Sequence, residues 1–136
     1  MTSVSSDTAK SIKYPRRTVE RAERALRCCP FKLKLFSSMR DQSVKLNAIA
    51  TNQGVELGYT HSPLSELTVE NSLMWLIQVG LLRREVDGQG ITDSFRLTPL
   101  GRQLVEKWQN TTNTLPAPSG SDRLYNLLNR WLRVPL

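Results

Sequence analysis

Apolar side chains recur every three or four positions along most of this chain, which is the spacing of one face of an α-helix. This pattern predicts a first helix over residues 18–29, with Thr18 as its N-cap and Pro30 as its stop. The apolar cluster at residues 31–39 contains interleaved lysines. It fits either a short helix or an extended arm, because periodicity alone does not distinguish the two.

The centre of the chain predicts two further helices. The first covers residues 43–52, and Gly54 is expected to terminate it. The second begins at Pro63 or at Thr68 and carries an apolar stripe until Gly80. This longer helix is therefore the third of three that precede the next feature of the pattern, a turn rich in glycine.

A β-hairpin is expected after the third helix, because two glycines fall within residues 87–90, between two strand-like runs. Thr98 and Pro99 then predict the start of another helix. Residues 111–121 contain two prolines and a glycine, which is typical of a linker. A last amphipathic helix is expected within residues 122–136, and its apolar stripe consists of Leu124, Leu127, Leu128 and Trp131.

The length and composition fit one soluble domain with an additional helix. The chain has 136 residues, of which 39% are hydrophobic and 23% are charged, so it can build a single core. Residues 1–13 are polar and are expected to be flexible, followed by a folded domain at 14–110. No apolar run is long enough to span a membrane and no secretion signal is evident, so we expect a cytoplasmic protein.

Catalytic and metal-binding chemistry finds little support in the sequence. Cys28 and Cys29 are neighbours and cannot form an unstrained disulfide, and we expect at least one of them to be packed inside. His61 is the single histidine, so no set of metal ligands can be assembled. No nucleophile motif or acid–base pair stands out. We therefore expect a protein that is not an enzyme and that needs no metal or cofactor.

Two stretches resemble the winged helix-turn-helix superfamily. One runs from Thr68 through Gly80-Leu81-Leu82, and the other is Phe95-Arg96-Leu97-Thr98-Pro99-Leu100-Gly101-Arg102-Gln103-Leu104. The second is similar to the pattern with which bacterial regulators of the MarR, PadR and ArsR kind leave the wing. The resemblance covers about residues 43–109. The chain is also similar to a family of cyanobacterial winged-helix proteins, a resemblance that adds no activity.

The resemblance implies a mainly α fold with a small β-hairpin wing (α+β), in which residues 14–110 form the winged-helix domain with extra N- and C-terminal helices. It also implies DNA binding through the third helix and the wing. The charge pattern departs from this expectation. Of the net charge of +7, residues 10–40 carry +8, residues 41–100 carry −3, residues 101–136 carry +3 and Asp7 supplies −1. The segment expected to touch DNA is thus the acidic one.

Candidate contacts to nucleic acid therefore fall into two groups. Asn71 and Gln78, on the non-core side of the third helix, are candidate base readers, and Arg84 in the hairpin is a candidate phosphate contact. The larger group lies on the N-terminal helix, where helical spacing brings three arginines to one face with a fourth beside them: Arg16, Arg17, Arg21 and Arg24. These arginines are either a phosphate-contacting stripe, which confers affinity rather than sequence choice, or a solvated face opposite the core.

Apolar side chains suggest an alternative function. Met74 and Trp75 are large where many winged helices are polar, so they form a candidate protein-binding patch unless the C-terminal helix covers them. The C-terminal stripe, with Leu124, Leu128 and Trp131 as candidates, can pack on the body, pair in a homodimer, dock elsewhere or lie on a membrane surface. The leading hypothesis is a small transcriptional regulator that binds DNA mainly through its basic N-terminal residues. The alternative is an adaptor that binds a protein partner.

Overall fold

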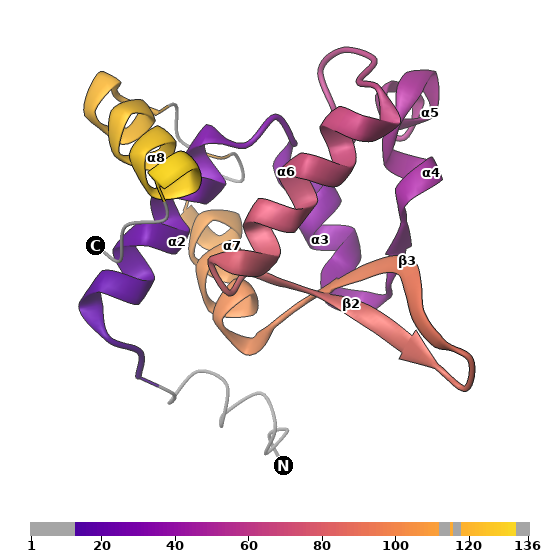
Figure 1. Ribbon diagram of the computed structural model, residues 1–136, viewed down its shortest axis with the longest axis horizontal. Helices are drawn as coiled ribbons and strands as arrows, with labels where there is room; N and C mark the ends of the chain where they lie inside the picture. The colour runs from indigo at the N-terminus through magenta and orange to yellow at the C-terminus, as the bar shows by residue number, and fades with distance from the viewer. Residues whose placement is uncertain (1–12, 112–114, 116–117, 133–136) are drawn as a thin grey trace.

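The computed structural model describes residues 13–111, 115 and 118–132, without the side chains of residues 129, 131 and 132. The fold consists of helices and one small sheet, as Figure 1 shows. The elements in chain order are α2 (Arg16–Cys28), α3 (Leu33–Asp41), β1 (Val44–Lys45), α4 (Leu46–Ile49), α5 (Thr51–Glu56), α6 (Glu66–Gln78), β2 (Leu82–Asp87), β3 (Gly90–Leu97), α7 (Pro99–Thr111) and α8 (Gly120–Leu132).

The sheet has three antiparallel strands in the order β1-β3-β2. Leu82 pairs with Leu97 and Val44 pairs with Phe95, so the buried ends of all three strands lie together. A register shift between Arg84 and Val86 separates this buried part from the tip of the hairpin, which projects beyond the helices (Figure 1). The predicted hairpin and its turn within residues 87–90 are confirmed.

One hydrophobic core joins the helices to the sheet. It includes Leu26 of α2, Phe36 of α3, Leu73 of α6, Phe95 of β3 and Val105 of α7, all of which are fully buried. The fold is mainly helical with a small antiparallel sheet, and this α+β class is the one that the sequence predicted. No helix among the described residues is long and apolar enough to cross a membrane.

The first two helices differ from the prediction at their starts. The helix α2 begins at Arg16, two residues before the predicted cap Thr18, and Pro15 stands at its N-cap position without a side-chain hydrogen bond. The fixed φ of proline already suits the entry to a helix, which accounts for the earlier start. The cluster at residues 31–39 forms the helix α3 rather than an extended arm.

The prediction of one helix over residues 43–52 is wrong. The segment starts as the strand β1 and then forms α4 and α5, with extended backbone at Ala50 between them. Gly54 lies inside α5 instead of ending it. A Cβ atom at Gly54 would lie 1.9 Å from the carbonyl oxygen of Ile49, so this glycine allows α4 and α5 to pack closely.

The helix α6 begins at neither Pro63 nor Thr68. Its N-cap is Ser65, whose hydroxyl accepts a hydrogen bond from the backbone N–H of Thr68 at 3.1 Å. The helix ends as predicted just before Gly80, which has a φ of 90°. Thr98 is confirmed as the residue that caps α7, because its hydroxyl accepts from the N–H of Gly101 at 3.0 Å.

The helix α8 begins at Gly120, inside the predicted linker of residues 111–121. Ser119 and Asp122 explain this start, because each side chain accepts a hydrogen bond from the backbone N–H of the other, at 3.1 and 3.0 Å. The helix packs against α2 (Figure 1). The predicted flexible segment before residue 13, and part of the linker, lie outside the described residues.

Candidate nucleic-acid interface

The outward face of α6 carries no basic side chain. Leu67, Asn71, Met74 and Gln78 are all exposed and share this face, with Leu67 at 67% and Met74 at 46% exposure. Asn71 and Gln78 therefore lie on the surface where the sequence placed them. Their apolar neighbours present no charge to a phosphate backbone.

Arg84, the candidate phosphate contact in the hairpin, already has partners within the protein. The Arg84 guanidinium lies 5.0 Å from the centre of the Phe95 ring, donates to the Met74 sulfur at 3.2 Å and approaches Asp93 to 3.7 Å. An acidic neighbour thus already balances the charge of this candidate phosphate contact. At the tip of the hairpin, Val86 and Ile91 pair across the strands and are 68% and 74% exposed.

We call this region the α6–hairpin surface and define it by its exposed residues. It combines apolar side chains with uncharged polar groups and an exposed carboxylate. Its members are Leu67, Asn71, Met74, Gln78, Val86, Ile91 and Asp93.

The arginines of α2 share one sector, as the spacing predicted, but they differ in exposure. Arg17 is exposed, and Arg16 is also exposed while paired with Glu20 at 3.3 Å. Arg21 and Arg24 are half-buried, and their Nε atoms are buried without a hydrogen-bond partner in the described part of the chain. The arginines therefore do not form a uniformly solvated face.

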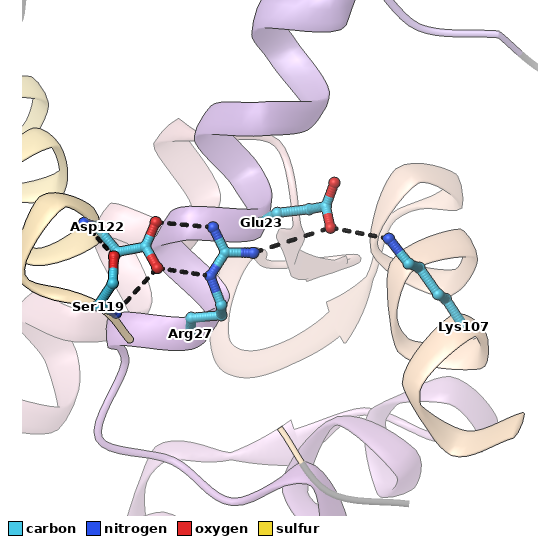
Figure 2. Close-up of polar contacts among 5 residues, drawn as sticks. All are labelled: Glu23, Arg27, Lys107, Ser119 and Asp122. Atoms are coloured by element: carbon cyan, nitrogen blue, oxygen red, sulfur yellow. Dashed lines mark hydrogen bonds and ion pairs between the residues drawn. The ribbon is translucent and has the colours of Figure 1, made fainter. Parts of the chain in front are cut away.

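The helix α8 lies over part of the arginine sector. The Arg24 guanidinium is 5.3 Å from the centre of the Tyr125 ring, a cation–π distance. Arg27 donates to both carboxylate oxygens of Asp122, at 3.1 and 2.9 Å, as Figure 2 shows. Both side chains of this pair are about four-fifths buried, with 22% and 19% exposure.

The ion pair extends across the body of the protein. Glu23 accepts from Lys107 of α7 at 3.1 Å and lies 4.0 Å from Arg27 (Figure 2). The hydrogen bonds from Arg27 and from the Ser119 N–H lower the pKa of Asp122 to about 2. We call this set, with Glu23, Arg27, Lys107, Ser119 and Asp122, the α8 clasp. The sequence pattern did not predict this set.

Trp75 lies beneath α8 rather than on the surface. Its side chain is 7% exposed, and its indole Nε1 donates to the Asn126 amide oxygen at 2.9 Å. Of the two alternatives that the sequence left for Met74 and Trp75, coverage by the C-terminal helix applies to Trp75 alone. Met74 stays exposed and belongs to the α6–hairpin surface.

The helix α8 contacts the body through polar side chains and turns part of its apolar stripe outward. Leu124 and Leu127 are 55% and 50% exposed, while Leu128 is half-buried. The side chain of Trp131 lies outside the described residues. Asp122 and Asn126 make the contacts to α2 and α6. The apolar stripe is therefore only partly packed on the body, because Leu124 and Leu127 remain about half exposed.

The two cysteines are free and are poor nucleophiles. The Cys29 thiol donates to the Leu26 carbonyl at 3.1 Å, and burial raises its pKa to about 12. Burial also raises the pKa of Cys28. Thiols of high pKa remain protonated near neutral pH, so neither provides a reactive thiolate. The described residues contain no group of three side chains placed to hold a metal ion.

Five arginines on α2 and α8 make no ion pair with the described residues. The helix α2 packs against both α6 and α8, and both α2 and α8 lie on the side of α6 away from the hairpin (Figure 1). We call this region the basic edge. Its members are Arg17, Arg21 and Arg24 of α2 and Arg123 and Arg130 of α8, which make no ion pair with the described residues.

Comparison with known proteins identifies a family. No curated protein and no solved structure matches the chain. The sequence pattern of the Npun_F0494-like family matches residues 12–130, which include all of α2 and most of α8. The basic edge and the α8 clasp both lie within the matched region. Because the match covers most of the sequence, the chain belongs to the Npun_F0494-like family.

Proposed function

We propose that this chain is a winged helix-turn-helix protein that binds nucleic acid through the basic edge and acts as a small cytoplasmic regulator. The order of elements supports the fold assignment: α3, then α4 and α5, then α6, then the β2–β3 hairpin and α7. In this assignment α6 is the third helix and the hairpin is the wing. The three-stranded sheet in the order β1-β3-β2 fits the same arrangement.

The observation that carries the binding proposal is that arginines without an ion pair to the described residues lie on α2 and α8, the two helices on the side of α6 away from the hairpin. Phosphate contacts from arginine supply affinity and orientation without reading sequence. The basic edge offers such contacts from two helices, α2 and α8. The outward face of α6 offers only Asn71 and Gln78 for base edges, so we expect sequence preference to be weak relative to overall affinity.

Salt dependence tests this proposal. Binding of a fluorescent duplex of mixed sequence, about two helical turns long, should weaken steeply between about 50 and 200 mM salt. Replacing Arg17, Arg21 and Arg24 with Ala should reduce the slope of log affinity against log salt by up to about three. Thermal unfolding of the variant checks that the loss is not caused by misfolding, since Arg24 packs on Tyr125.

The matched control replaces three arginines away from the basic edge, Arg83, Arg96 and Arg102, with Ala. It removes the same charge, and we expect it to reduce the slope by less than about one. An equal effect of both variants would reduce the proposal to a general effect of net charge. No binding of the wild-type chain at 50 mM salt would refute nucleic-acid binding itself.

A second candidate function rests on the α6–hairpin surface. Leu67, Met74, Val86 and Ile91 are each between 46% and 74% exposed, and the exposed Asp93 is on the same hairpin as Val86 and Ile91. An exposed apolar group with few charges is typical of a protein-binding site. Under this alternative the chain is an adaptor, and α6 contacts a protein partner instead of a DNA groove.

A further inference from the structure

A pocket opens where α8 meets the end of α2 and the turn that follows it. Its volume is about 760 Å³, within the range of sites that hold small molecules. Its apolar lining residues include Pro30, Leu115 and Leu127. Its polar lining residues include Arg123, Asn126 and Arg130, which lie on the same side of α8 as Leu127.

The polar lining residues of the pocket offer hydrogen-bond donors. Arg123 and Arg130 have only donors on their side chains, and neither makes an ion pair with a described residue. The amide oxygen of Asn126 accepts from the Trp75 indole N–H at 2.9 Å. This contact fixes the orientation of the amide and leaves its NH₂ group as the end available to a ligand.

No carboxylate on α8 competes for these donors. Asp122 is the single acidic residue of the helix, and both of its oxygens accept from Arg27. One of the same oxygens also accepts from the N–H of Ser119 at 3.0 Å. The pocket therefore combines two arginines that make no ion pair with the described residues, an oriented amide donor and apolar lining residues.

Covalent chemistry is not expected in this pocket, although two thiols line it. The Cys29 thiol is turned toward the carbonyl oxygen of Leu26, and Cys28 is half-buried. A protonated thiol that already donates to a backbone carbonyl is a poor nucleophile. Any ligand is thus expected to bind reversibly, by charge, hydrogen bonds and apolar contact.

We propose that this pocket binds a small organic anion. Its carboxylate, sulfonate or phosphate group lies against Arg123, Asn126 and Arg130, and its apolar body lies against Pro30 and Leu127. Such a ligand touches α2 and α8 at once and so holds α8 on the body. The proposal does not depend on nucleic-acid binding, because it rests on the shape and donors of the pocket alone.

The probe for the test is 8-anilinonaphthalene-1-sulfonate, an aromatic sulfonate whose fluorescence rises on binding. We expect one bound molecule per chain, and at least about tenfold weaker binding by the variant Arg123→Gln/Arg130→Gln, because hydrogen bonds to charged groups are lost. The control Arg83→Gln, on the hairpin, should bind within about twofold of the wild type. The substituted arginines make no ion pair with described residues, so the variant should fold.

A second pair of variants tests the apolar contact between the ligand and Leu127. Leu127 lines the pocket and Leu124 does not, although both lie on α8 with 50% and 55% exposure. Leu127→Ser should weaken binding by about threefold to tenfold, and Leu124→Ser should leave it within about twofold. Equal effects of the two serine variants would show that the dye binds the outer stripe of α8 and would overturn the proposal.

Two further arms distinguish the ligand class. The uncharged analogue N-phenyl-1-naphthylamine should bind at least about tenfold more weakly than the sulfonate, and equal binding would overturn the anion site. Arg123 and Arg130 also belong to the basic edge, so a DNA duplex should compete with the dye for them at about 50 mM salt. At about 200 mM salt, where the duplex binds weakly, the dye should still bind; loss of the dye together with the duplex over this range would overturn the small-ligand proposal. Failure of either arm is independent of the salt test, which uses Arg17, Arg21 and Arg24.

Discussion

The basic edge and the α6–hairpin surface lie on opposite sides of α6, and their arginines differ in whether they have an acidic partner. On the hairpin, Arg84 lies over an aromatic ring and next to the carboxylate of Asp93. On the basic edge, the single acidic residue of α8 is occupied by Arg27, which leaves Arg123 and Arg130 without an ion pair to the described residues. Local pairing, rather than net charge, therefore decides which cations are available to a partner.

The residues that position α6 in the fold do not determine whether its outward face can bind DNA. The third helix of the proposed winged helix is positioned by Ser65, Gly80 and the core, and none of these constrains the charge on its outward face. The arginines instead lie on the two terminal helices, which the α8 clasp joins. Each prediction below tests whether the two surfaces are as distinct as their contacts indicate.

Breaking the α8 clasp should have the largest effect on stability. In Arg27→Ala, the mostly buried carboxylate of Asp122 loses two charge-assisted hydrogen bonds, so the free energy of unfolding should fall by about 2 kcal/mol. Urea unfolding measures this loss. The control Arg16→Ala removes an exposed pair with Glu20 and should leave the unfolding midpoint nearly unchanged. A similar loss in both variants would show that the clasp does not hold α8.

Acid should loosen the same clasp. The folded-state pKa of Asp122, about 2, lies below its ordinary value of 3.8, so the unfolded chain takes up this proton first. The contribution of Asp122 to stability is present above about pH 4 and is lost as the pH falls toward 2. Unfolding midpoints measured between pH 5 and 2 should decline more steeply for the wild type than for Asp122→Asn. Parallel curves would contradict this assignment.

The α6–hairpin surface should tolerate new charge with the smallest effect. Leu67 and Met74 are exposed, so Leu67→Glu/Met74→Glu should change the free energy of unfolding by less than about 0.5 kcal/mol per site. Duplex affinity should fall by less than about threefold if the basic edge carries the binding. A loss of about a hundredfold would place α6 in a groove after all. If the chain is an adaptor, this variant should instead lose its protein partner.

Sequence periodicity predicted most helices and the hairpin, because apolar spacing and capping residues such as Thr98 and Gly80 act locally. It failed at Gly54, whose role depends on the approach of the Ile49 carbonyl. Packing between elements, rather than the local pattern, decided that position.

The candidate site was harder to predict than the fold. Arg27 and Asp122 are 95 positions apart, and Trp75 and Asn126 are 51 apart. No spacing rule links residues at such separations, so the sequence left the burial of Trp75 as one of two alternatives and gave no sign that Leu124 turns outward. The spacing did place Arg17, Arg21 and Arg24 in one sector, which shows that positions on a single helix are easier to foresee than contacts between helices.

Asp122 takes part in both the cap of α8 and the pair with Arg27, so its carboxylate joins local folding to docking. A helix of this length is marginal alone in water. Its formation and its attachment are therefore one cooperative step, and amide protons throughout α8 should exchange with solvent through a shared opening event rather than by fraying one turn at a time. The terminal helix thus behaves as a single unit that is either in place or unfolded.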